Sequence, residues 1–343
     1  MNIGIVMPTM GVTGGVRRIV EIANRLVEYK HNVTIYNDQK NRAETWLKPM
    51  KFLYQQKRLS DILKESNKDV WLCGWPNFES WVYTTIKGKV FYLIQHIEGS
   101  WKEHINNKNC STISFSTYAY NWTVENSNHK NHYKCIGGLN TDIFNCDINK
   151  VAHERVQRMN FGNKFVILGY PRKRAKYLVK AVDILNNDSI ELRFFGNPKV
   201  DDCNKSKYFK GQYYHSRPQN EIPNIYSGAD LYVSLQTERA CWNNPVAEAM
   251  ACGCPVVTTD VGAVQDLKCA GLISLPSLKK FKNDENHFIG SLAAKIKDAM
   301  WLFRIKVGSS HVNTFIENSY KHVQQFSWNN IFPKFEGIVC GKQ

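Results

Sequence analysis

The chain of 343 residues lacks several patterns that assign a protein quickly to a class. No apolar run approaches the ~20 residues of a membrane-spanning helix, and the mean hydropathy is −0.41. The first residues, Met-Asn-Ile-Gly-Ile-Val-Met, lack the basic region and the cleavage site of a signal peptide. We therefore expect a cytoplasmic protein that does not span a membrane.

The ten cysteines include no Cys-x-x-Cys pair, the spacing typical of metal ribbons and redox motifs. Cys252 and Cys254 are two residues apart, but they fall at a predicted helix end and a predicted strand start, which is poor geometry for a metal. Scattered cysteines in a reducing compartment are usually free thiols in the core. The sequence therefore predicts neither a disulfide framework nor a metal site.

Acidic residues are few relative to basic ones, 30 against 45, which gives a formal net charge of +15. The excess is spread over both halves of the chain, and no long basic run concentrates it. Such a charge favours anionic partners: a nucleotide diphosphate, an anionic membrane face or a nucleic acid. It does not choose among them.

Apolar runs of strand length alternate with amphipathic helical segments, and the alternation occurs twice. This pattern predicts an α/β protein with two parallel sheets, each covered by helices on both faces. Polar residues around position 155 separate the two units. The expected strands are Ile3–Met7, Asn32–Tyr36, Asp69–Cys73, Val90–Ile94, Thr112–Ser116, Lys164–Leu168, Glu191–Phe195, Leu231–Leu235 and Pro255–Thr258; the expected helices are Val16–Tyr29, Ala175–Leu185, Glu221–Tyr226, Val246–Cys252 and Leu292–Phe303.

The most informative segment is Trp242-Asn-Asn-Pro-Val-Ala-Glu-Ala-Met-Ala-Cys-Gly-Cys-Pro-Val-Val. Asn243 or Asn244 is a good N-cap, Pro245 suits the first helical position, and Gly253 suits the left-handed helix end. A helix that starts at a loop can bind an anion with its free N–H groups. Glu248, one turn inside, could accept hydrogen bonds from hydroxyls of the same ligand. The spacing alone favours the alternative, an ordinary loop–helix–strand unit with Glu248 on a solvated face.

Two further loops have residues suited to phosphate binding. Gly14 and Gly15 open the first helix after the first strand, although they do not form the Gly-x-Gly-x-x-Gly dinucleotide fingerprint. Pro171-Arg-Lys-Arg follows the first strand of the second unit, where Arg can hold a phosphate with two hydrogen bonds and Lys can hold it as a point charge. A solvated surface loop is the alternative in both cases.

Glu248-Ala-Met-Ala-Cys-Gly-Cys-Pro-Val-Val resembles the donor-site signature of retaining glycosyltransferases of the GT-B fold, family 4. The segment Gly14-Gly15-Val-Arg-Arg resembles the first loop of the same family. The resemblance implies two doubly wound Rossmann-like domains facing across a cleft: residues 1–155 on the acceptor side, residues 156–325 for the nucleotide sugar, and residues 326–343 crossing back. That family has a second Glu eight residues before the matched one, where this chain has Ala240. The nearest acid is Glu238.

The resemblance also assigns roles to individual residues. Arg172 and Lys173 would neutralise the donor diphosphate, with Arg174 as an alternative to Arg172, and His96 would face the reacting sugar. Glu238 would hold that sugar if it replaces the missing Glu. The expected donor-binding residues are Gly14, Gly15, Gly196, Asn244, Val246, Ala247 and Glu248, of which Val246 and Ala247 act through backbone N–H groups and Glu248 through the ribose hydroxyls.

The expected activity is transfer of a hexose from a nucleotide diphosphate sugar to an acceptor hydroxyl, with retention and without a metal or another cofactor. The absence of an Asp-x-Asp motif in a strand-end loop agrees with metal independence. The expected acceptor is a surface glycan or glycolipid, with peripheral contact to the anionic inner membrane face. The alternatives are a glycosyltransferase that modifies bases of viral DNA and a nucleotide-sugar binding or epimerase-like protein.

Overall fold

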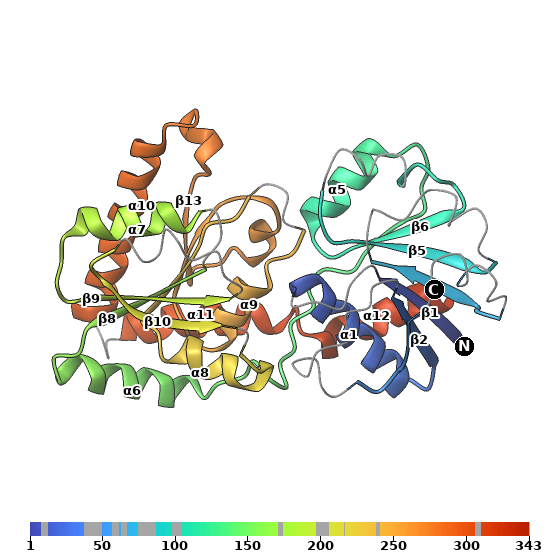
Figure 1. The fold of residues 1–343 in the computed structure, drawn as a ribbon, viewed down its shortest axis with the longest axis horizontal. Helices are drawn as coiled ribbons and strands as arrows, with labels where there is room; N and C mark the ends of the chain where they lie inside the picture. The colour runs from blue at the N-terminus through green and yellow to red at the C-terminus, as the bar shows by residue number, and fades with distance from the viewer. Residues whose placement is uncertain are drawn as a thin grey trace. The chain divides into compact units, whose positions relative to one another are not determined.

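The computed structural model describes residues 1–7, 13–37, 50–56, 62, 67–74, 87–97, 105–170, 174–196, 206–215, 217–237, 241–305 and 310–342. The chain divides into two compact units. Unit 1 comprises Met1–Gly138, Arg239–Trp242 and Trp328–Gln343, and unit 2 comprises Leu139–Glu238 and Asn243–Ser327. Each unit has one parallel sheet with its own core, as the alternating sequence pattern predicts (Figure 1).

The sheet of unit 1 has the order β3-β2-β1-β4-β5-β6-β7 in the described part of the chain, and all its pairs are parallel. In β1, every residue from Ile3 to Met7 is buried, because helices cover both faces of a parallel sheet. The strands are β1 Asn2–Met7, β2 Asn32–Asn37, β3 Leu53–Gln56, β4 Val70–Cys73, β5 Lys89–Ile94, β6 Cys110–Ser114 and β7 His132–Lys134.

The helices of unit 1 are α1 Gly14–Glu28, α5 Thr117–Asn126 and α12 Trp328–Cys340 among the described residues. Helices α1 and α12 pack on the same core of the first sheet and lie side by side in Figure 1. The indole N–H of Trp328 donates to the Glu21 carboxylate of α1, and both side chains are buried. This contact fixes the last helix of the chain to the first one.

The sheet of unit 2 has the order β10-β9-β8-β11-β12-β13, again with parallel pairs only. Helices α7 and α10 pack on each other, and α8 and α11 each contact α9; Figure 1 shows α7 with α10 on one side of the sheet and α6 with α8 on the other. The strands are β8 Phe165–Gly169, β9 Ile190–Gly196, β10 Phe209–His215, β11 Leu231–Ser234, β12 Val256–Thr259 and β13 Leu272–Leu275; the helices are α6 Ile148–Asn160, α7 Ala175–Leu185, α8 Ile222–Ser227, α9 Asn244–Ala251, α10 Glu285–Met300 and α11 Ser310–Gln324.

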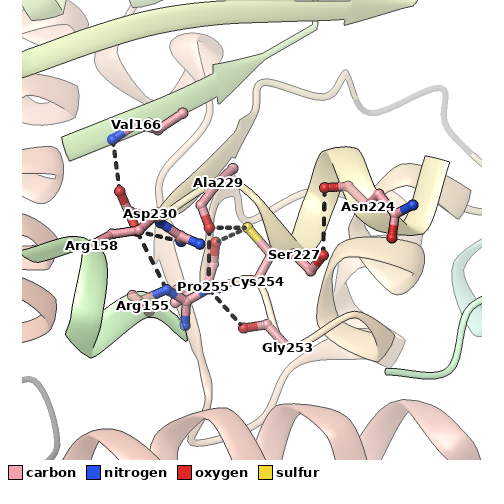
Figure 2. Close-up of polar contacts among 10 residues, drawn as sticks. All are labelled: Arg155, Arg158, Val166, Asn224, Ser227, Ala229, Asp230, Gly253, Cys254 and Pro255. Carbon is pink, nitrogen blue, oxygen red and sulfur yellow. Dashed lines mark hydrogen bonds and ion pairs between the residues drawn. The ribbon is translucent and has the colours of Figure 1, made fainter. Parts of the chain in front are cut away.

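The boundary between the units lies at Gly138 and Leu139, and not at the predicted position after residue 155. The polar segment before residue 160 forms α6, which a buried arginine attaches to unit 2. Arg155 is 1 % exposed and donates to the carbonyls of Ala229 and Gly253 at 3.1 and 3.2 Å. Figure 2 shows its guanidinium beside the Asp230 carboxylate, at 3.5 Å. The polar composition of this segment predicts a boundary between the units. The contacts of Arg155 that attach the segment to unit 2 are visible only in the structure.

Asp230 is the centre of this polar cluster. Its second carboxylate oxygen accepts from the backbone N–H of Val166 at 2.8 Å, and Arg158 of α6 binds the first oxygen at 3.1 Å (Figure 2). Two cations and a backbone donor thus compensate an aspartate that is 1 % exposed, as burial of a charge requires. The cluster fixes α6 at the amino ends of β8 and β11, away from the carboxyl ends of the strands.

A pair of histidines in unit 1, the buried His132 and the partly buried His129, gives this fold a defined response to acid. His132 of β7 accepts or donates through Nδ1 to Thr112 Oγ1 at 2.8 Å, and its ring lies 4.5 Å from that of His129. Burial, reinforced by His129, lowers the pKa of His132. The unfolded chain therefore takes up a proton first as the pH falls below the ordinary histidine value of about 6.5.

Above that pH, we expect His132 to contribute to the free energy of unfolding. This contribution is lost as the pH falls through the lowered pKa of His132 in the folded state. The free energy of unfolding of wild type should therefore decrease more steeply between about pH 7.5 and 5 than that of His132→Gln. Urea unfolding at several pH values measures the difference. Parallel pH profiles for the two proteins would contradict it.

The described cysteines are free, and most are buried, as predicted. In the described residues, no helix combines the length and the apolarity needed to cross a bilayer.

Candidate functional site

The strand orders define where each sheet can bind a ligand. In unit 1 the order reverses between β1 and β4, and in unit 2 it reverses between β8 and β11. Doubly wound sheets bind ligands at the carboxyl ends of the strands that flank such a reversal, because the loops after those strands diverge to opposite faces. The predicted site residues follow strands at these edges.

In unit 2, the carboxyl edge is held together by a chain of hydrogen bonds between strand ends. Arg174, which precedes α7, donates from Nη1 to the carbonyl of Gln236 at 2.6 Å. The backbone N–H of Gln236 donates to Thr259 Oγ1 at 2.7 Å. The ends of β8, β11 and β12 are therefore fixed relative to one another. Arg174 is the predicted alternative to Arg172 for binding the donor diphosphate. In this structure its guanidinium holds the residues after β8 and β11 together.

Helix α9 begins at this edge, after β11. Asn243 is its N-cap, and its side-chain oxygen accepts from Val246 N at 3.4 Å. The backbone N–H of Ala247 donates to the carbonyl of Asn243 at 3.2 Å. The two N–H groups predicted to bind phosphate thus have partners within the helix start. An anion that reached Val246 N would replace the long bond to the Asn243 side chain.

Glu248 lies one turn into α9 and is 2 % exposed. This burial excludes the solvated face that the sequence left open. Its Oε2 accepts from the hydroxyl of Tyr226 on α8, at 3.3 Å. Burial of a carboxylate costs free energy, because the charge loses its hydration, unless partners compensate it. Tyr226, 22 residues earlier, carried no sequence signal for this role.

A cavity of about 320 Å³ lies beside α8, lined by Tyr214, Arg217, Glu221, Asn224 and Ile225. Tyr214 stands near the carboxyl end of β10, so the cavity opens at the same edge of the sheet. It combines an aromatic ring, a cation and an amide in a concave surface. These are the groups that bind a planar heterocycle by stacking and by hydrogen bonds.

Gly196 closes β9 with a backbone φ of +132°, a value that residues with a side chain rarely adopt. A Cβ at this position would lie 2.5 Å from the ring of Tyr170, which follows β8. The hydroxyl of Tyr213 donates to the Gly196 carbonyl. Gly196, a predicted donor-binding residue, thus lies with Tyr213 and Tyr214 at the ends of the adjacent strands β9 and β10.

We expect Gly196→Ala to destabilise this edge by about 1–3 kcal/mol, because the new Cβ meets the Tyr170 ring and the backbone conformation is strained. Gly290→Ala is the matched control: it lies on the exposed side of α10 with open space around it, where alanine should stabilise the helix by up to about 1 kcal/mol. Urea unfolding curves of both variants measure the two effects. Equal stability of Gly196→Ala and wild type would contradict the strain.

In unit 1, Gly14 and Gly15 form the first turn of α1, which Thr13 caps by accepting from Val16 N at 3.2 Å. A Cβ on Gly15 would lie 2.7 Å from Oε1 of Gln95, and Nε2 of Gln95 donates to the Gly74 carbonyl at 3.0 Å. The glycine therefore permits contact between the α1 start and the end of β5. Gln95 is a residue of this edge that sequence reasoning missed.

His96 follows Gln95 directly and is exposed. It therefore lies at the carboxyl edge of unit 1, where the resemblance predicts a residue that faces substrate. Arg18 of α1 is buried, donates to the Gly137 carbonyl at 2.6 Å and lies 4.4 Å over the ring of Phe115. Burial lowers the pKa of Arg18 to about 10. Its role in the Gly-Gly-Val-Arg-Arg segment is structural.

The structure thus brings together Gly196, Asn244, Val246, Ala247 and Glu248 at one edge of unit 2. Gly14, Gly15 and His96 lie at the corresponding edge of unit 1. Three predicted catalytic residues, Arg172, Lys173 and Glu238, lie outside the described residues.

Residues 162–283, which belong to unit 2 except for Arg239–Trp242, match the family model described as "Glycosyl transferases group 1". A search of curated protein sequences finds no match. Among solved structures, HepE of Anabaena in complex with UDP and glucose matches with a TM-score of 0.77 at 12 % identity, covering 99 % of this chain and 100 % of that one.

A glycosyltransferase from Rickettsia africae matches with a TM-score of 0.74 at 17 % identity, covering 98 % of this chain and 97 % of that chain. WaaG, described as a glycosyltransferase involved in lipopolysaccharide biosynthesis, gives 0.67 at 13 % identity, with 99 % and 100 % covered. Likeness over nearly the whole length establishes the fold: the chain has the GT-B fold of these glycosyltransferase structures.

Proposed function

We propose that this protein transfers a sugar from a nucleotide diphosphate sugar to an acceptor hydroxyl. The observation that carries the proposal is Glu248: a buried carboxylate one turn inside α9, at the carboxyl edge of a doubly wound sheet. It belongs to the part of the chain that matches the group 1 glycosyltransferase model. A helix start followed by one inward carboxylate suits a phosphate joined to a ribose.

We assign the nucleotide to three consecutive features of unit 2. The base occupies the cavity lined by Tyr214, Arg217 and Asn224, and the ribose hydroxyls donate to Glu248. The cavity lies beside α8, the same helix from which Tyr226 donates to Glu248. The diphosphate lies at the start of α9, where Asn244 and the N–H groups of Val246 and Ala247 precede Glu248. UDP is the first nucleotide to test, because HepE was solved with UDP and with UDP-glucose.

Bond cleavage leaves negative charge on the diphosphate, and groups placed to meet that charge lower the barrier. We assign this work to Arg172 and Lys173, together with the α9 start. Glu238 would hold the transferred sugar in place of the Glu that the family has at the position of Ala240. We further propose retention of the anomeric configuration and no metal in the reaction, so added Mg²⁺ or Mn²⁺ should change turnover less than about twofold.

We assign the acceptor side to unit 1, with His96 facing the reacting sugar and Gly14 and Gly15 close to it. A surface glycan or glycolipid is the proposed acceptor. WaaG is involved in lipopolysaccharide biosynthesis, and the net charge of +15 suits an anionic lipid surface. The free thiols suit a reducing compartment such as the cytoplasm.

A panel of nucleotide sugars tests the function. Each is added to the protein, first in a thermal-shift assay and then with detection of released nucleotide and free sugar. We expect one donor to raise the melting temperature and to be hydrolysed slowly without acceptor. Binding without release or transfer to any glycan would favour a nucleotide-sugar binding protein. Transfer to DNA, with salt-sensitive DNA binding, would reassign the acceptor.

A further inference from the structure

A second cluster of functional side chains lies in unit 1, away from the carboxyl edge. His31 precedes β2, and Glu336 and Cys340 lie on α12. The Nε2 atom of His31 lies 3.0 Å from Glu336 Oε1 and 3.6 Å from Cys340 Sγ. All three potential ligand atoms fall within 4.8 Å of one another. Within the described residues, this is the one group of three with that geometry.

We propose that His31, Glu336 and Cys340 bind a zinc ion that fastens the C-terminal helix to unit 1. Imidazole, carboxylate and thiolate are all ligands that Zn²⁺ accepts. Two ligands at about 2.0–2.3 Å from a tetrahedral zinc lie about 3.3–3.7 Å apart. The observed separations of 3.0 and 3.6 Å need only a small adjustment to reach these values.

The local structure preorganises the three ligands. Glu336 and Cys340 are four residues apart on α12, so they lie on one face of the helix. The side chains of His31 and Glu336 are only 7 % exposed, which removes competing water and limits their motion. A water molecule would complete the four-coordinate sphere of the ion.

Lys342 provides the discriminating observation. Its Nζ lies 2.6 Å from the same Glu336 oxygen that faces His31, while the lysine side chain is 63 % exposed. An exposed lysine can swing into water, so zinc can displace it from Glu336. If His31, Glu336 and Cys340 bind no metal, Lys342 stabilises the Glu336 carboxylate by an ion pair. If they bind zinc, Lys342 competes with the metal for that carboxylate.

The position of the cluster indicates a structural ion. His31 stands at the amino end of β2, a strand of six residues, so about 20 Å separate the cluster from the carboxyl edge. The ion would join residues 305 apart in sequence. It is therefore independent of the proposed sugar-transfer site, and its test does not depend on the activity.

The test is zinc titration of the chelator-treated full chain against a chromophoric chelator. We expect one zinc per chain with micromolar or tighter affinity and a higher melting temperature with zinc. Loss of a supporting group around a metal costs roughly 10–100-fold in affinity, so His31→Gln and Cys340→Ser should each lose at least tenfold. Cobalt substitution should give the visible absorption of a thiolate-ligated tetrahedral ion.

Two variants separate this site from adventitious binding. Cys269→Ser, at another half-buried free thiol, should leave the affinity unchanged. Lys342→Met should tighten zinc binding by roughly two- to fivefold, because it removes an exposed competing ion pair. The proposal is overturned by no zinc at micromolar concentration, by equal binding in Cys340→Ser and wild type, or by weaker binding in Lys342→Met.

Discussion

Glu248→Ala is expected to lower kcat/KM for the nucleotide sugar by more than about 100-fold, because hydrogen bonds to a charged group contribute about 1.5–3 kcal/mol each and two ribose hydroxyls are lost. The loss should fall mainly on donor binding. Titration calorimetry with UDP and initial rates of nucleotide release measure the two parts. Glu248→Gln, which keeps an acceptor oxygen without the charge, should fall between wild type and alanine.

The control must separate binding from folding, because Glu248 is buried against Tyr226. Tyr226→Phe removes the neighbouring hydroxyl and keeps the carboxylate, so it should weaken donor binding only several-fold. Glu317→Ala removes one acid from a surface pair with Lys321 and should leave rates unchanged. If Glu248→Ala and Glu248→Gln fold and keep donor kinetics within about threefold of wild type, the ribose assignment is wrong.

Lys173→Ala is expected to lower kcat by roughly 100–1,000-fold, the effect of removing one preorganised group that stabilises developing charge. Lys173 follows Tyr170 and precedes Arg174 in the chain, and Arg174 is fixed to the carbonyl of Gln236. The described residues on either side of Lys173, Tyr170 and Arg174, therefore lie at the carboxyl edge where α9 begins. Because the negative charge on the diphosphate increases during cleavage, kcat should fall more than donor affinity.

The single-turnover rate of donor cleavage and a separate measurement of donor affinity test whether kcat falls more than the affinity does. Lys180→Ala is the matched control: it removes an exposed lysine of α7 one heptad further on and should have no effect. Arg174→Ala should reduce rates less than Lys173→Ala, since its contact holds the strand ends together. A variant Lys173→Ala with normal kcat and a raised KM would assign Lys173 to ground-state binding only.

The strands that could be predicted from the sequence are those with continuous apolar runs in the interior of each sheet. The four strands that were missed are the four edges, β3, β7, β10 and β13. Strands β3, β7 and β13 have only three or four residues, and the longer β10 is partly polar, with the sequence Phe-Lys-Gly-Gln-Tyr-Tyr-His. Pairing with one neighbour, and not their own composition, makes them strands. Four of the described helices were also missed: α5, α6, α11 and α12.

Helix boundaries followed the caps where these were recognised. Asn243, one of the two predicted N-caps, caps α9, so the helix begins at Asn244, two residues before the expected Val246. Asp284 caps α10, which therefore begins at Glu285, seven residues before the predicted start at Leu292. Strand β6 ends at Ser114 and not at Ser116, because Ser116 instead caps α5.

The candidate site also contains some residues that the sequence predicts and others that it does not. Gly14, Gly15 and Glu248 could be predicted because loop chemistry and a resemblance mark them locally. Their partners could not: Gln95 meets Gly15 across 80 residues, and Tyr226 meets Glu248 from another helix. Nor does spacing bring His31 to Cys340. Contacts of this kind are set by tertiary packing, which a local pattern does not encode.

The most direct test of the central claim is a crystal structure of this chain with bound UDP. The account predicts the diphosphate at the start of α9, the ribose hydroxyls within hydrogen-bond distance of the Glu248 carboxylate, and the uracil in the cavity beside Tyr214 and Arg217. UDP bound elsewhere, with no ribose hydroxyl near Glu248, would contradict it.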